Sequence, residues 1–233
     1  MDHNCRVIGF LGVDKYDFIL YLSRILYAMG KKILLVDYSE NYALSCCIPH
    51  PEALRKDILE YRGIYYMNGA GSGENYSLIN DTIEIHNQQY DYILVDYGFD
   101  FNSIGLNNCD AIICVTDQQL HNLRQFSLNN REDNIKGILT ALIIRDVGDC
   151  KTKYRYLIDE MGLDQIAVTQ TFITYQDDLD VRYRLNCQYD GVVRLHRLSK
   201  YMKAVLKGIV ELIVPEVDRK TVNKAFIRAA KGG

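Results

Sequence analysis

The first 37 residues combine two short apolar runs with one helical pattern. The runs at residues 7–11 and 33–36 predict two buried β-strands. Between them, apolar residues recur at the spacing of an amphipathic helix that Gly30 ends: Phe18, Leu22, Ile25, Leu26 and Met29. This order of elements predicts a right-handed βαβ unit. Its first loop then lies at the carboxyl edge of a parallel sheet, where such folds bind ligands.

The apolar runs recur downstream and indicate one α/β domain. Further strands are predicted within residues 64–67, 90–98, 109–117, 137–146 and 166–168. Helices are predicted around Ile83 and Ile85, up to Gly162, and over residues 195–213. We therefore expect a single-domain, mostly parallel β-sheet with helices on both faces over residues 1–214. Residues 215–233 would form a basic C-terminal tail or a short amphipathic helix.

Several segments resemble the MinD/ParA group of deviant-Walker P-loop ATPases. The run GKKILLVD at residues 30–37 is similar, almost letter for letter, to the family's second strand, and GVDK at residues 12–15 stands where the family has GVGK. YDYILVDYG at residues 90–98 resembles its Walker B segment. The resemblance extends over most of the chain and implies a P-loop NTPase-like fold. It also implies a turn at residues 172–178 and a vestigial ATP site made by Gly12, Lys15, Asp37 and Asp96.

The residues that carry the family's chemistry are replaced. A P-loop works because glycine-exposed backbone N–H groups converge on phosphate while a hydroxyl holds magnesium. Here Asp14 replaces the last loop glycine, Tyr16 and Asp17 replace the hydroxyl residues, and the loop is several residues too short. The carboxylate of Asp14 would repel a triphosphate. We therefore expect no resident cofactor or metal, with ATP and Mg²⁺ as the alternative.

Two further family positions are altered. Ser39 stands where the family has an aspartate that positions the attacking water, and a serine hydroxyl is not an adequate base. Arg145 replaces the base-recognising asparagine and has donors only. No catalytic residue is therefore assigned, and an enzyme is the less favoured interpretation. The purely structural alternative makes Lys15 an exposed lysine paired with Asp14 or Asp17, and Asp96 a helix cap or ion-pair partner.

Composition excludes few functions. The net charge of −3 and the pI near 6.0 give no overall bias towards nucleic acid. A DNA-binding role is therefore unlikely without a local patch, for which the candidates are Arg124, Arg131, Arg145, Arg182, Arg184, Arg194 and Arg197. The seven cysteines lack CxxC spacing, which predicts reduced, mostly buried thiols. A redox-active Cys46–Cys47 pair is the alternative.

The tail and the N-terminus bear on location. No window reaches the ~18 apolar residues of a membrane span, so we expect a cytoplasmic protein. In the basic tail, Val222, Ala225, Phe226 and Ala229 share one helical stripe with a single large residue. A flexible tail or a partner-docking helix is favoured. Weak membrane contact, which would place the protein at the inner face of the membrane, is the alternative.

The glycine-rich run at residues 68–73 is expected to be a mobile turn.

The favoured hypothesis is a degenerate MinD/ParA-like pseudo-ATPase. It would act as a localisation or scaffold factor for a cell-envelope machine, as the resemblance to localisation proteins of Tad pilus and secretion systems implies. The alternatives are an atypical ATP-binding switch and a partition-type DNA-binding protein. A homodimer is expected through the carboxyl edge of the sheet, with Asp14, Lys15 and Tyr16 exposed at the interface.

Overall fold

A computed structural model describes residues 5–49, 58–68, 89–100, 104–129, 139–162 and 168–231. Its strands are β1 (Arg6–Gly12), β2 (Ile33–Asp37), β3 (Leu59–Tyr61), β4 (Ile64–Asn68), β5 (Tyr92–Asp96), β6 (Ala111–Thr116), β7 (Leu139–Val147) and β8 (Val168–Tyr175). Its helices are α1 (Tyr16–Ala28), α3 (Leu120–Asn129), α4 (Tyr154–Met161), α5 (Asp178–Asp190), α6 (Lys200–Ile213) and α7 (Arg219–Lys231). Short 3₁₀ turns are η1 (Ser45–Cys47), η3 (Ile104–Asn108) and η6 (Leu195–Arg197).

The strands in the described part of the chain form one eight-stranded sheet. Their order is β3-β4-β2-β5-β1-β6-β7-β8, and only β3 runs antiparallel to its neighbour. Asp96 of β5 pairs in register with Phe10 of β1 and with Asp37 of β2. The carboxyl ends of these three central strands are therefore level, and the mostly parallel sheet predicted from the apolar runs is confirmed.

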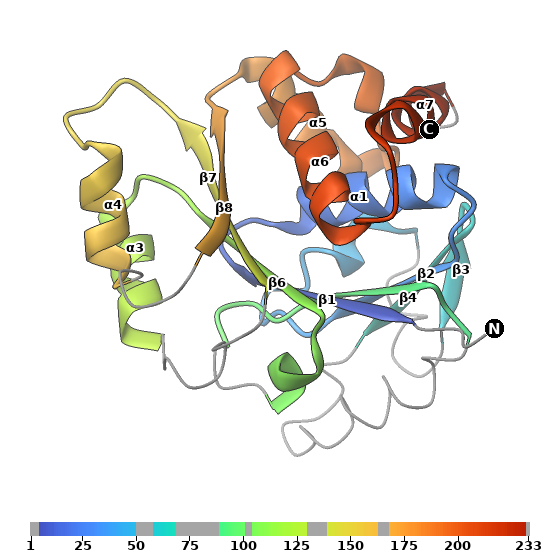
Figure 1. Ribbon diagram of the computed structural model, residues 1–233, viewed down its shortest axis with the longest axis horizontal. Coiled ribbons are helices and arrows are strands. Elements are labelled where there is room, and N and C mark those ends of the chain that lie inside the picture. Colours follow the sequence, from blue (N-terminus) through green and yellow to red (C-terminus); the bar gives the residue numbers. More distant parts are fainter. Residues whose placement is uncertain are drawn as a thin grey trace.

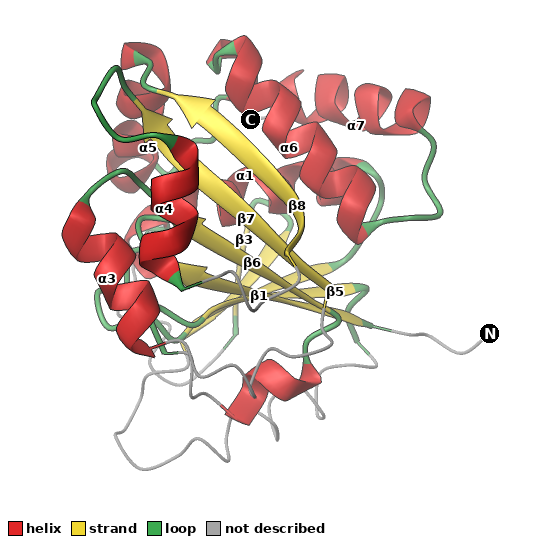
Figure 2. Ribbon diagram, turned by 60° about the vertical axis from the view of Figure 1, so that its left-hand side comes forward, coloured by secondary structure: helices red, strands yellow, loops and turns green. Residues whose placement is uncertain are grey.

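Helices cover both faces of the sheet, as predicted. Side chains alternate across the strands, so Ile8 and Phe10 join the core beneath α1, α5, α6 and α7, while Val7 and Leu11 join the core beneath α3 and α4. Figure 1 shows the two groups of helices, and the turned view separates α3 and α4 from α6 and α7 with the strands between them (Figure 2).

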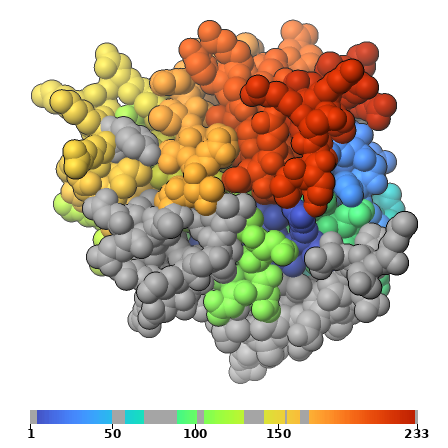
Figure 3. Space-filling model, in the orientation of Figure 1, coloured from blue at the N-terminus to red at the C-terminus, as the bar shows by residue number. Residues whose placement is uncertain are grey.

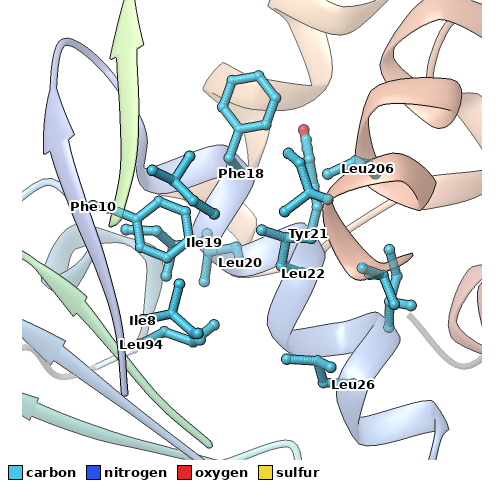
Figure 4. Packing of buried hydrophobic residues seen from close by; sticks show 14 of the residues in the cluster. Ile8, Phe10, Phe18, Ile19, Leu20, Tyr21, Leu22, Leu26, Leu94 and Leu206 are labelled. Carbon is cyan, nitrogen blue, oxygen red and sulfur yellow. The ribbon is translucent and has the colours of Figure 1, made fainter. Parts of the chain in front are cut away.

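Helix α1 is enclosed along most of its length. Every residue from 16 to 26 is buried, which is typical of a helix that is covered on all sides. Figure 4 shows Ile8, Phe10 and Leu94 of the sheet next to the apolar side chains of α1, with Leu206 of α6 on another side. The first residues of α1 are therefore held rigidly above the carboxyl edge of the sheet.

Two predicted boundaries were wrong. The C-terminal helix begins at Lys200 and not at residue 195, because the Ser199 hydroxyl accepts a hydrogen bond from the Met202 N–H at 3.1 Å and caps it. The segment predicted as a turn from residue 172 is strand β8 up to Tyr175, with Phe172 buried. Beyond Asn68, the glycine-rich run lies outside the described residues, as does the helix predicted around Ile83 and Ile85.

The C-terminal segment packs onto the domain. Its apolar stripe, Val222, Ala225, Phe226 and Ala229, is buried in the core shared with α1 and α6, and Lys207 of α6 lies 5.2 Å from the Phe226 ring centroid. The space-filling view shows this C-terminal part covering the upper face of the molecule (Figure 3). In this conformation the stripe does not face solvent, a bilayer or a partner, which differs from the expected flexible or partner-docking tail.

This packing predicts that substitutions at two neighbouring residues of α7 change the free energy of unfolding by different amounts. Phe226 is 6% exposed and Ile227 is 56% exposed. Phe226→Ala should lower the free energy of unfolding by about 3 kcal/mol because it opens a cavity, whereas Ile227→Ala should change it by less than ~0.5 kcal/mol. Urea denaturation of the two variants measures both values. Equally small effects would mean that α7 is not docked.

Candidate functional site

The connection between β1 and α1 is very short. Only Val13, Asp14 and Lys15 separate the last strand residue, Gly12, from the first helical residue. Gly12 has φ +107°, and a Cβ there would lie 1.9 Å from the Val115 carbonyl oxygen, so only glycine fits. Asp14 also has a positive φ, of 26°, and is exposed. The chain thus turns sharply here and forms no wide loop.

The N–H groups of the last strand residue and of the first residue of this connection are bound by the protein itself. The Gly12 N–H donates to the Gly98 carbonyl at 2.7 Å, and the Val13 N–H donates to the Val115 carbonyl at 3.0 Å. A phosphate-binding loop requires such groups to converge on an anion. These two N–H groups point instead at the neighbouring strand ends.

Lys15 is buried and forms an internal ion pair. Its Nζ lies 2.8 Å from Asp96 Oδ1 and donates to the Gly12 carbonyl at 2.8 Å. The two side chains are 4% and 2% exposed. Asp96 Oδ1 also accepts the Gly98 N–H at 2.9 Å. The expectation of an exposed Lys15 paired with Asp14 or Asp17 was wrong, because Lys15 folds back over the strand ends to Asp96.

Asp37 lies beside Asp96 but is held by two serines. Its Oδ1 accepts the Ser39 N–H at 3.0 Å and the Ser39 hydroxyl at 2.5 Å. Its Oδ2 accepts the Ser45 N–H and hydroxyl, both at 3.0 Å. Burial and the neighbouring charge of Asp96 raise the pKa of Asp37, while these hydrogen bonds oppose the shift. All four donors come from the chain that follows β2.

The residue that replaces the family's magnesium-binding hydroxyl points elsewhere. Tyr16 is 4% exposed, and its hydroxyl donates to the Arg184 carbonyl of α5 at 3.2 Å. Burial raises the pKa of this phenol, and the nearby Asp17 adds to the shift. Tyr16 is therefore a packing and hydrogen-bonding contact between α1 and α5, not the exposed interface residue that was expected.

A second buried ion pair joins α1 to β7. Arg145 Nη1 and Nη2 donate to the two carboxylate oxygens of Asp17 at 3.1 and 3.0 Å, and the side chains are 2% and 1% exposed. Arg145 also lies over the Phe18 ring, with 5.3 Å from Cζ to the centroid. Its Nε lies 3.2 Å from Asp146 Oδ2, which also binds Arg184 at 2.7 Å. Four alternating charges thus connect α1, β7 and α5.

The pKa shifts in this network follow from burial and charge. Complete burial raises the pKa of Asp17, with the Arg145 guanidinium acting in the opposite direction. Burial acts to lower the pKa of Arg145, but the carboxylates of Asp17 and Asp146 outweigh it and the pKa is raised. For Asp146, the two arginines outweigh burial and lower the pKa. Each charge therefore depends on its neighbours to remain buried.

Solved structures with this arrangement of strands and helices are numerous. A chain of the MinC:MinD cell division protein complex of Aquifex aeolicus is similar with a TM-score of 0.67 and 15% identity, over 92% of this chain and 98% of that chain. The chain has the ParA/MinD-type P-loop ATPase fold. A ParA family ATPase from Chlorobium tepidum TLS has a TM-score of 0.62 and 16% identity, over 91% and 100%. No protein-family model and no curated protein matches the sequence.

A third similar structure carries a bound nucleotide analogue. A protein described as a plasmid partition protein from Borrelia burgdorferi B31, bound to AMPPNP, has a TM-score of 0.62 and 16% identity, over 91% of this chain and 100% of that chain. In the present chain the corresponding connection is three residues long, and Lys15 is paired with Asp96.

The four residues expected at the vestigial site do lie together at the strand ends. Gly12, Lys15 and Asp96 are in direct contact, and Asp37 is next to Asp96. Sequence reasoning missed the Asp17–Arg145 pair, although it noted both replacements separately. The signal was that an acid and a base had replaced neutral residues at two positions that both belong to the family's nucleotide site.

Only some of the arginines considered for a DNA-binding patch lie in one region: Arg182, Arg194 and Arg197 are exposed on and just after α5. Arg145 is buried, Arg184 is bound to Asp146, and Arg124 lies on α3, across the sheet from α5. Arg131 lies outside the described residues. In the described ranges, no three His, Cys, Asp or Glu side chains are grouped as metal ligands. None of the helices described here has the length and apolar character needed to cross a bilayer.

The buried Asp17–Arg145 pair predicts that the free energy of unfolding depends strongly on both residues. Arg145→Met should lower the free energy of unfolding by about 3–5 kcal/mol, because Asp17 stays buried without its counter-charge. The double variant Asp17→Leu/Arg145→Met should lose much less, because no buried charge is left alone. The exposed Arg194–Asp190 pair, at 3.6 Å, provides the control, and Arg194→Met should cost less than ~1 kcal/mol. Chemical denaturation gives all three values. Equal losses of unfolding free energy for Arg145→Met and Arg194→Met would contradict this prediction.

Proposed function

We propose that this chain is a catalytically degenerate MinD/ParA-like protein, a pseudo-ATPase that acts as a nucleotide-independent localisation or scaffold factor. The observation that carries the proposal is the buried ion pair between Lys15 and Asp96. In the family that the sequence resembles, these positions serve the phosphates and the magnesium shell. Here they neutralise each other beneath a three-residue connection.

The remaining nucleotide positions support the same proposal. Ser39, in the place of the hydrolytic aspartate, donates its hydroxyl to Asp37. Arg145, in the place of the base-recognising asparagine, binds Asp17 with both terminal nitrogens. At three positions that correspond to the family's nucleotide site, the side chains thus bind other side chains of the same protein. This leaves neither a general base nor an electrostatic clamp for phosphoryl transfer.

The partner is proposed to be a protein in a membrane-associated assembly, such as a pilus or secretion machine, served from the cytoplasmic side of the membrane. A similar structure from Aquifex aeolicus is a complex of MinD with MinC, so this fold offers surfaces for protein partners. A homodimer is proposed through the carboxyl edge of the sheet. Lys15 and Tyr16 are buried and are not part of that interface, so exposed residues of the same edge must form it.

One observation favours the second candidate, an ATP-binding switch without efficient turnover. Lys15, Asp37 and Asp96 are still adjacent, and the ParA/MinD-type structure from Borrelia burgdorferi B31 binds AMPPNP. In such a switch, ATP would have to break the Lys15–Asp96 pair. Lys15→Ala is a poor test of this candidate, because it would leave Asp96 buried without its counter-charge.

The two candidates differ in their response to Mg-ATP. A ligand present at 100 times its Kd raises the free energy of unfolding by about 2.7 kcal/mol. We expect no rise in thermal stability and no titration heat up to millimolar Mg-ATP. Asp14→Gly is the informative variant, because Asp14 is exposed at positive φ and its loss removes the repulsive carboxylate. The pseudo-ATPase predicts no binding by this variant either. Binding by the wild type, strengthened in Asp14→Gly, would establish the switch.

The proposed homodimer predicts which surface mutation weakens it. Leu120 is 40% exposed at the carboxyl edge, where it begins α3 after β6. Leu120→Asp should raise the dimer Kd at least about tenfold, which corresponds to roughly 1.4 kcal/mol. Ile227→Asp, on the exposed side of α7, should leave the Kd unchanged. Sedimentation equilibrium measures both, and a dimer unaffected by Leu120→Asp would place the interface elsewhere.

A further inference from the structure

Two cysteine thiols from distant parts of the sequence meet in the core. Cys47 lies in η1 and Cys187 in α5, and their side chains are 3% and 1% exposed. Element η1 packs directly against α5, and the Cys187 thiol is close enough to Cys47 to raise the Cys47 pKa. Cys47 Sγ also donates to the Ala43 carbonyl at 3.3 Å, and Cys187 Sγ donates to the Arg184 carbonyl at 2.9 Å.

Cys47 and Cys187 belong to the two segments, η1 and α5, that contribute polar contacts at the carboxyl edge of the sheet. In η1, Ser45 provides two of the four hydrogen bonds to Asp37. In α5, Arg184 binds Asp146 through its side chain and Tyr16 through its carbonyl. η1 packs directly against α5. A covalent bond between the two sulfurs would therefore fix the loop after β2 to the helix that carries the second network.

Access to the pair is controlled by η1. The neighbouring Cys187 thiol, burial and nearby charges raise the pKa of Cys47, so the packed thiol is protonated and is a poor nucleophile. The neighbouring Cys46 is exposed, so this turn lies at the surface, and oxidation of Cys47 would require a local opening of η1. Such local openings are a normal property of short surface turns.

We propose that Cys47 and Cys187 are a reversible oxidation site that a hydroperoxide converts to an intramolecular disulfide. In the opened state, the Cys47 thiolate attacks the O–O bond of hydrogen peroxide, giving a sulfenic acid and, with one proton, water. The Cys187 thiol then attacks the Cys47 sulfur, the S–S bond forms, and the sulfenic oxygen leaves as a second water. Two thiols lose two electrons and two protons, and one peroxide is reduced. The product locks η1 onto α5.

The site is independent of the proposed function. It needs neither nucleotide nor partner, and would be present in a pseudo-ATPase or in a switch. The structure has all seven cysteines as free thiols, which makes the reduced form the starting state. In a reducing compartment such disulfides are transient and respond to oxidants.

The test uses the full chain with and without one equivalent of hydrogen peroxide. Trypsin releases residues 33–55, with Cys46 and Cys47, and residues 185–194, with Cys187. We expect these peptides to be linked in the wild type and in Cys46→Ser, and separate after dithiothreitol. Because Cys46→Ser retains only Cys47 in the first peptide, it assigns the bond. In this variant, oxidation should also raise the urea midpoint of unfolding, and reduction should restore it.

Three results would overturn the proposal. One is alkylation of both Cys47 and Cys187 as free thiols after peroxide treatment of the folded protein. Another is a linked peptide that disappears in Cys46→Ser, which would assign the chemistry to the exposed thiol. The third is oxidation confined to dimers joined through Cys46. The wild type and the Cys46→Ser variant both retain Cys47 and Cys187, so the outcome does not depend on a core substitution that could unfold the protein.

Discussion

The bidentate contact between Asp17 and Arg145 is the interaction on which the carboxyl edge of the sheet depends. It places a negative charge in the first turn of α1, where the helix dipole and the Phe18 N–H favour a carboxylate, and a positive charge at the end of β7. Neither charge could remain buried alone, because desolvation would cost several kcal/mol. The start of α1 is therefore tied to β7, and Asp146 and Arg184 extend the tie to α5.

The same charge balance underlies the proposed loss of nucleotide binding. The buried cations at this edge are Lys15 and Arg145, each already paired with a carboxylate, and Arg184 is paired with Asp146. A nucleotide triphosphate would bring several negative charges next to Asp37, Asp96 and the exposed Asp14. To bind it, the chain would have to break an internal ion pair and leave a carboxylate buried without a partner. In the proposed pseudo-ATPase, this electrostatic penalty would oppose nucleotide binding in addition to the loss of the catalytic residues.

Much of the fold was predictable because local patterns determine it. The apolar runs and the helical spacing located β1, α1 and β2 closely, since burial on a sheet imposes a period that the sequence must follow. Boundaries were less accurate where a single polar contact decides them. The Ser199 cap moved the start of α6, and pairing with β7 kept residues 172–175 in strand β8. The docking of α7 depends on distant apolar surfaces of α1 and α6, which the pattern of its own stripe does not identify.

The site illustrates the limit of reasoning from aligned positions. Comparison with the family identified which residues had changed, but not where the new side chains would point. Lys15 was expected in solvent because its neighbours in sequence are acidic, whereas its partner is Asp96 at the end of another strand. The internal ion pairs stabilise one arrangement of this edge. The proposed docking role requires only one such arrangement, whereas a nucleotide cycle requires two states of similar free energy.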